Sequence, residues 1–250
     1  MTLDSHLLLS GLFIFSRATA MLLSAPIAGN LVPATVRVMF GLVLSLSLTP
    51  VLQGSIMANP ATVGHLVAMV LYEAFVGLLI GGSLQLLVAA GQMAGQFVDI
   101  QIGTGSAQLF NPYFGGSASP VAQLKMMLTT VLILLLNGHR MMIGAFAASY
   151  GSHSMDPGTV QQGLLPLLTK LGSVSLQMAA PVVAVTVVID LAAGVVNKAV
   201  PQTQPFLVSL PAKLSAGLVA LSLGMPAVVV AVENGLDIVF RQLGVMFKGG

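Results

Sequence analysis

Charged residues are scarce in this sequence. Its 250 residues include nine Lys and Arg and seven Asp and Glu, so charged residues make up 6% of the chain, against about 25% in soluble domains. Hydrophobic residues make up 56%. So few charges do not cover the surface of a soluble domain, and they are too few for a basic patch that follows a nucleic-acid backbone. The composition therefore excludes a soluble enzyme, a disordered chain and a nucleic-acid binder, and it predicts a polytopic membrane protein.

Cysteine is absent, which excludes disulfides, thiolate metal sites and a cysteine nucleophile. The four His do not occur at the i, i+4 spacing of zinc ligands on a helix. We therefore expect no metal, no other cofactor and no enzymatic activity.

A cleaved signal peptide is not expected either. Leu7–Ser16 is apolar and Ala18-Thr19-Ala20 resembles a cleavage site, but residues 1–6 contain no Lys or Arg. Secretory signal peptides begin with a basic region. We interpret the first apolar segment as a retained membrane span.

The expected fold class is all-α, a polytopic membrane protein of about six long apolar helices in a single domain over residues 1–250. A spanning helix needs about 20 mostly apolar residues. Proline within an apolar segment predicts a kink or a broken helix, as at Pro181, Pro211 and Pro226. The stretches Met141–Tyr150 and Leu164–Leu171 are too short to cross a membrane, and we expect them to form interfacial or buried half-helices. The six segments are Leu7–Ser24, Val38–Leu52, Leu66–Ala90, Val121–Leu136, Val174–Val196 and Phe206–Val232.

The third segment carries a polar stripe and continues as a helix to about Gln101, beyond the width of a bilayer. At about 100° per residue, four polar side chains fall within an arc of about 60°. Gly77 and Gly81 lie beside this arc. Two interpretations remain open, a seam of small residues where helices approach closely and the wall of an aqueous path. The stripe consists of Gln85, Gln92, Gln96 and Asp99.

Charged side chains inside apolar segments are costly and each needs a partner or a role. Asp190 shares one helical face with Gly194, Asn197 and Lys198. Interhelical ion pairs explain such charges, and a proton or ion relay is the functional alternative. The charges concerned are Arg17, Glu73, Lys125, Asp190 and Lys213.

The loop after the polar stripe, from Gly103 to Ser119, combines Gly and Ser with bulky aromatics and has no charge. A serine nucleophile with His139 as base has no supporting signature, and a phosphate cradle would need a Lys in the loop. Glycine permits several backbone states, and packed aromatics bury large apolar areas. The loop therefore predicts a plug in a path, formed by Gly103, Gly105, Phe110, Asn111, Pro112, Tyr113, Phe114, Gly115 and Gly116.

Short motifs along the whole chain resemble the FliR family of flagellar export-gate proteins. They begin with Arg17, Pro26, Pro33 and Arg37, continue with Gly95, Asp99, Gln101 and Gly103 before Asn111-Pro112, and include Asn137-Gly138-His139. The strongest block contains Gly194, Asn197, Lys198, Pro201, Gln202 and Pro211. The chain departs from the family pattern at Lys198, where Arg is more frequent, and at Thr203-Gln204-Pro205, where a more apolar stretch is usual.

This resemblance implies a non-enzymatic subunit of the type III protein export gate, built into a multi-subunit helical assembly. It implies an inner-membrane location in the flagellar basal body, and FliP-, FliQ- and FlhB-type partners around the path of unfolded flagellar subunits. It also implies that the loop 103–119 plugs the closed gate. The alternatives are the equivalent subunit of a virulence injectisome (the SctT family) and a small-molecule or ion transporter.

Overall fold

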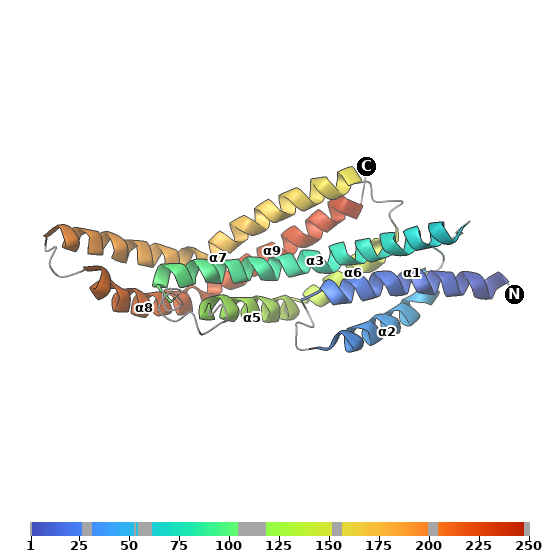
Figure 1. Ribbon diagram of the computed structural model, residues 1–250, viewed down its shortest axis with the longest axis horizontal. Coiled ribbons are helices and arrows are strands. Elements are labelled where there is room, and N and C mark those ends of the chain that lie inside the picture. The colour runs from blue at the N-terminus through green and yellow to red at the C-terminus, as the bar shows by residue number, and fades with distance from the viewer. Residues whose placement is uncertain are drawn as a thin grey trace. The chain divides into compact units, whose positions relative to one another are not determined.

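The structure of the chain, a computed structural model, describes residues 2–26, 32–52, 54, 62–104, 119–151, 157–199 and 205–247. Over these ranges the chain forms eight α-helices and no β-strand (Figure 1). The predicted all-α fold class is therefore confirmed. The helices are α1 (Thr2–Ser24), α2 (Ala34–Leu52), α3 (Val63–Ile102), α5 (Pro120–Leu135), α6 (Gly138–Ala148), α7 (Pro157–Ala199), α8 (Pro205–Leu223) and α9 (Met225–Phe247).

Four helices in the described part of the chain, α1, α2, α3 and α7, are each long and apolar enough to cross a membrane. The number rises to six if α5 with α6, and α8 with α9, each cross as one bent pair. The 40 residues of α3 and the 43 residues of α7 correspond to about 60 and 64 Å of helix. Both are longer than the ~30 Å hydrocarbon core. The predicted continuation of the third segment is confirmed, because α3 ends at Ile102.

One predicted segment was wrong. Leu164–Leu171 is not a separate short helix, because it lies inside α7, which runs on through Pro181. Phe206–Val232 contains the junction of α8 and α9, which meet at Gly224 with a bend of 55°; this break lies two residues before Pro226, where a kink or broken helix was predicted.

The break between α8 and α9 has a local cause. Pro226 is the second residue of α9, where a helix needs no backbone N–H from it. A Cβ added to Gly224 would lie 3.0 Å from Cβ of Pro181 in α7, so the close approach requires glycine. Pro211 lies inside α8 without ending it.

A second break separates α5 from α6. Asn137 stands at the break with φ 60° and ψ 26°, the left-handed conformation. Asn adopts this conformation more readily than other residues that carry a Cβ. The stretch predicted as Met141–Tyr150 corresponds to α6 and the two residues after it.

The chain divides into two compact units that share α3, α7, α9 and, by its last two residues, α5. Unit 1 comprises Met1–Leu86, Leu134–Leu168 and Leu236–Gly250, and its fully buried side chains include Phe13, Met21, Ile80 and Phe146. Unit 2 comprises Leu87–Ile133 and Thr169–Gly235, and its fully buried side chains include Leu87, Ile102, Ile133 and Met178. Each unit therefore has its own apolar core.

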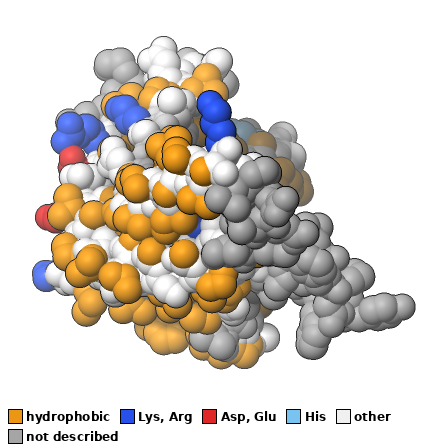
Figure 2. Space-filling view, turned by 90° about the vertical axis from the view of Figure 1, so that its left-hand side faces the viewer, with side chains coloured by type: hydrophobic (Ala, Val, Ile, Leu, Met, Phe, Trp, Pro, Cys, Tyr) orange, Lys and Arg blue, Asp and Glu red, His pale blue; other side chains and the backbone are white. Residues whose placement is uncertain are grey.

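Large apolar side chains are also exposed on the helices. Figure 2 shows hydrophobic side chains, between stretches of white atoms, over much of the described surface on the face that it displays. The exposed residues of α7 and α8 include Val188, Leu191, Val195 and Leu223. Apolar faces of this kind need lipid or other protein to cover them.

Candidate functional site

The polar stripe of α3 divides into two kinds of residue. Gln85, Gln92 and Gln96 are exposed, whereas Asp99 is only 1% exposed. Asp99 therefore does not share the position of the glutamines and does not face the exposed side of α3. Met93 and Phe97 are also exposed beside the three glutamines, and the pore-facing role of the stripe stays a prediction.

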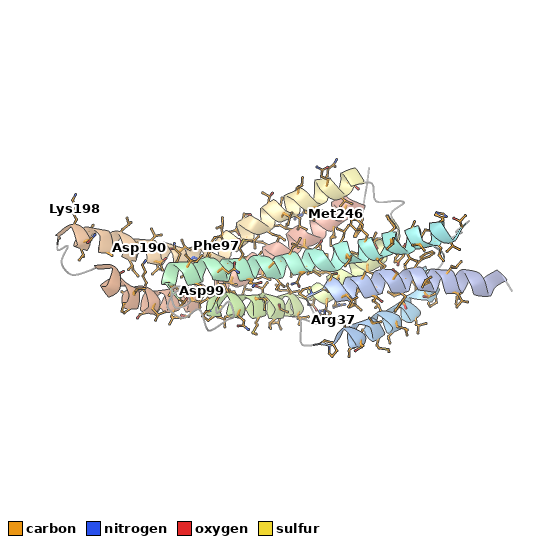
Figure 3. The ribbon with its side chains drawn as sticks, viewed as in Figure 1. Arg37, Phe97, Asp99, Asp190, Lys198 and Met246 are labelled. Atoms are coloured by element: carbon orange, nitrogen blue, oxygen red, sulfur yellow. The ribbon has the colours of Figure 1, made fainter. Side chains whose placement is uncertain are left out.

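Asp99 instead binds the start of α5, next to which it lies in Figure 3. The backbone N–H of Ala122 donates to Asp99 Oδ2 at 3.0 Å, and that of Val121 donates to Oδ1 at 3.4 Å. The first N–H groups of a helix have no partner within the helix, and the positive end of the helix dipole attracts a carboxylate. Asp99 therefore caps α5 from another helix.

The same carboxylate holds the residues that follow α3. The Thr104 hydroxyl donates to Asp99 Oδ1 at 2.6 Å, and the Gly103 N–H donates to the Asp99 carbonyl at 3.1 Å. Gly103 has φ 88°, a conformation that favours glycine. The other predicted plug residues, from Gly105 to Gly116, lie outside the described part of the chain.

Two glycine pairs of α3 meet two different helices. In unit 1, a Cβ on Gly77 would collide with the Arg17 carbonyl of α1, and a Cβ on Gly81 would collide with the Met21 carbonyl. In unit 2, a Cβ on Gly91 would collide with the Thr129 side chain of α5, and a Cβ on Gly95 would collide with the backbone of Ala122. Such contacts are typical of helices packed through small residues.

Arg17 lies at the centre of a buried polar cluster in unit 1. Its Nε donates to Glu73 Oε2 of α3 at 2.6 Å, and its Nη1 donates to Ser149 Oγ at 2.6 Å. The guanidinium carbon lies 3.8 Å from the centre of the Tyr150 ring, a cation–π contact. The Arg17 and Glu73 side chains are 4% and 13% exposed. The cluster ties α1, α3 and the end of α6 together.

In unit 2 the charges inside the apolar segments also have partners. Lys213 of α8 pairs with Asp190 of α7, and the buried Lys125 Nζ donates to the Met178 carbonyl at 2.6 Å. Both contacts join different helices. They favour a role of these charges in holding helices together over a role in a proton or ion relay.

The remaining motif residues mostly mark helix ends. Pro26 and Pro33 flank the junction between α1 and α2, and Arg37 donates from Nε to the Val32 carbonyl at 3.2 Å. Gly138 is buried at the start of α6, and Nδ1 of His139 is buried without a hydrogen-bond partner. Asn197 and Lys198 are exposed near the end of α7, which Figure 3 shows for Lys198. Pro201 and Gln202 lie outside the described residues.

Ser149 and Tyr150 carry no sequence signal that would have placed them beside Arg17. Their contacts arise because α6 begins after the left-handed turn at Asn137, a position that the family motif marked without indicating a turn. Among the described residues, no group of three His, Asp or Glu side chains could hold a metal ion.

The family of bacterial export proteins, family 1, matches residues 8–238 of the chain. The chain belongs to this family. The resemblance that the short motifs indicated is thus confirmed, and the chain is a multi-pass membrane protein of bacterial protein export.

Curated relatives of this export protein are similar to it over most of their length. The flagellar biosynthetic protein FliR of Caulobacter vibrioides is 30% identical over 220 residues, which are 86% of this chain and 88% of the relative. FliR of Bacillus subtilis is 29% identical over 93% of this chain and 92% of the relative. FliR of Escherichia coli is 25% identical over 91% of this chain and 88% of the relative.

Proposed function

We propose that this export protein is a non-enzymatic subunit of the flagellar type III export gate in the bacterial inner membrane. It helps to form the channel through which unfolded flagellar subunits leave the cytoplasm, and flagellum assembly requires it. Its neighbours in the gate are FliP- and FliQ-type membrane subunits and a FlhB-type partner.

The observation that carries this proposal is the match to relatives named flagellar biosynthetic protein over about nine-tenths of both chains. These names favour the flagellar gate over the injectisome. Helices of about 60 Å in α3 and α7, with exposed apolar side chains along them, support a place inside a larger protein assembly, because lipid covers only about half of such a length.

Deleting the gene is expected to abolish flagella and swimming, because without the channel no rod, hook or filament subunit crosses the membrane. The measurement is the amount of hook and filament protein in the culture medium, with complementation by the intact gene as control. Normal secretion of these proteins by the deletion strain would contradict the proposal.

The loop 103–119 is proposed to close the channel when no substrate is present. The support comes from its sequence, with three aromatics between Phe110 and Phe114, and from its position after the exposed glutamines of α3. Glycine permits several backbone conformations and aromatic side chains pack through apolar contacts, a composition that suits a stopper displaced by an entering polypeptide.

Deleting Phe110–Gly116 is therefore expected to leave the gate assembled but permeable. The measurement is uptake of a small dye, or ion conductance, in cells that express the complete gate, together with co-purification of its subunits. Loss of assembly without a leak would make the loop a structural element. Loss of export while the closed gate stays tight would make it a substrate contact.

A further inference from the structure

Helix α2 of unit 1 packs on α1 mostly through small residues (Figure 1). Its buried residues are Gly41, Ser45, Thr49 and Leu52. A Cβ added to Gly41 would lie 2.7 Å from Oγ1 of Thr19 in α1, so the two helices approach closely there. The Ser45 and Thr49 hydroxyls donate to carbonyls within α2 and need no partner in α1.

The other side of α2 carries its large apolar residues. We call it the outer side, and its exposed side chains include Met39, Phe40, Val43, Leu46 and Val51. From residue 38 to residue 52 the helix has no charge, and the exposed Ser47 hydroxyl donates to the Val43 carbonyl at 2.9 Å. A helix on the surface of a soluble protein turns its apolar residues inward, whereas helices in a membrane pack through small residues. The packing of α2 is therefore that of a membrane helix with a lipid-facing side.

The length of α2 also fits lipid. Its 19 residues correspond to about 28 Å of helix, close to the ~30 Å hydrocarbon core. The helices α3 and α7 extend well beyond that thickness and need protein to cover the rest. Acyl chains alone are long enough to cover the outer side of α2.

A groove lies on the first turns of the outer side. It has a volume of about 290 Å³. Four of its five lining residues are apolar, which suits an acyl chain. The groove is lined by Thr35, Val36, Met39, Phe40 and Val43.

Arg37 lies at the same end of α2, as Figure 3 shows. Its Nε donates to the Val32 carbonyl at 3.2 Å, and its Nη1 donates to the Leu23 carbonyl at 3.4 Å. These bonds use two of the five N–H groups of a guanidinium. Within the described part of the chain, no carboxylate forms an ion pair with Arg37. A guanidinium binds phosphate well, and cations next to a membrane helix attract anionic lipid headgroups.

We propose that the outer side of α2 faces lipid and binds one anionic phospholipid, with an acyl chain in the groove and the phosphate beside Arg37. Apolar contact and opposite charge act on the two parts of the same molecule. The inference needs only a protein that resides in a membrane, so it does not depend on the flagellar role, and the secretion assay of the deletion strain tests that role separately.

The test uses the protein purified from its native membrane with the subunits that accompany it, the latter freed of cysteine. This chain has no cysteine, so Val43→Cys carries a single bimane fluorophore in the groove. The protein is reconstituted into vesicles of phosphatidylglycerol and phosphatidylcholine, one of which is brominated and quenches the fluorophore on contact. We expect brominated phosphatidylglycerol to be preferred about tenfold, the effect of one charge-assisted hydrogen bond.

Two kinds of control separate a bound lipid from the bulk bilayer. Leu46→Cys places the fluorophore on the outer side but away from the groove lining, and it is expected to be quenched by both lipids without preference. Arg37→Gln is expected to remove the preference at Val43→Cys, and Arg37→Lys, which keeps the charge, to retain part of it. Arg241→Gln removes the same charge from an exposed pair on α9 and is expected to leave the preference unchanged.

A preference for phosphatidylglycerol at Val43→Cys that is lost in Arg37→Gln supports the inference. Absence of quenching by either lipid would show that a protein partner covers α2, and overturns it. Equal quenching by both lipids in the otherwise natural chain also overturns the binding site. The same holds if the preference survives in Arg37→Gln.

Discussion

Replacing Arg17 with Met is expected to destabilise the protein by about 3–5 kcal/mol, because it leaves the buried Glu73 carboxylate without its cation. The same change removes the bond to Ser149 and the contact with the Tyr150 ring. Unit 1 would then lose the cluster that joins α1, α3 and the end of α6. The measurements are thermal unfolding of the purified gate in detergent and the amount of chain that co-purifies with its partners.

Two further variants separate the ion pair from the general effect of losing an arginine. Arg241→Met makes the same change in an exposed pair with Asp237, whose side chains are 71% and 65% exposed, where we expect an effect within about 1 kcal/mol. Arg17→Met combined with Glu73→Leu removes both buried charges, and it is expected to recover part of the stability. A double variant less stable than Arg17→Met alone would show that Glu73 is satisfied by other groups.

Adding a single methyl group to Gly77 or Gly81 is expected to disrupt the packing of α1 on α3. A Cβ at either position would collide with a backbone carbonyl of α1 and lie 3.0 Å from a backbone nitrogen, that of Met21 in α1 for Gly77 and that of Ala25 directly after α1 for Gly81. Backbone atoms do not move aside as flexible side chains do, so Gly77→Ala and Gly81→Ala should each cost about 1–3 kcal/mol. Leu at either position should block assembly of the gate.

Gly82 provides the control for this seam. It neighbours Gly81 on the same helix, but a Cβ added there would meet nothing within 4 Å. Gly82→Ala is therefore expected to stabilise the helix by about 1 kcal/mol through helix propensity. The readouts are unfolding temperature and co-purification of partners. Equal behaviour of Gly81→Ala and Gly82→Ala would show that α1 and α3 are not in close contact.

Composition and hydrophobic pattern were sufficient to predict the helices, because apolar length alone separates a spanning helix from a connection. They could not distinguish a proline that breaks a helix from one that does not. Pro181 and Pro211 lie inside α7 and α8, whereas the break falls at Gly224 because a neighbouring helix approaches there. The break therefore reflects both the local sequence, which places Pro226 in the first turn of α9, and the packing of unit 2, which places Pro181 against Gly224.

The candidate site was predictable as a set of residues and less so as a set of contacts. Periodicity grouped Asp99 with Gln85, Gln92 and Gln96, since all four fall on one side of an ideal helix. It could not show that the edge of this side, where Asp99 lies, is covered by α5. Likewise, Arg17 stood out as a costly charge, but its partners lie 56 and 132 positions away in the chain, beyond the reach of any spacing rule.

The length of α3 and α7 bears on how the cell makes this protein. Ribosome-bound insertion machinery releases apolar segments sideways into lipid, but helices of about 60 Å place roughly half of their apolar surface beyond the hydrocarbon core of ~30 Å. Until other gate subunits arrive, that surface is open to chaperones and membrane proteases. We therefore expect copies made in excess of the partners to be degraded.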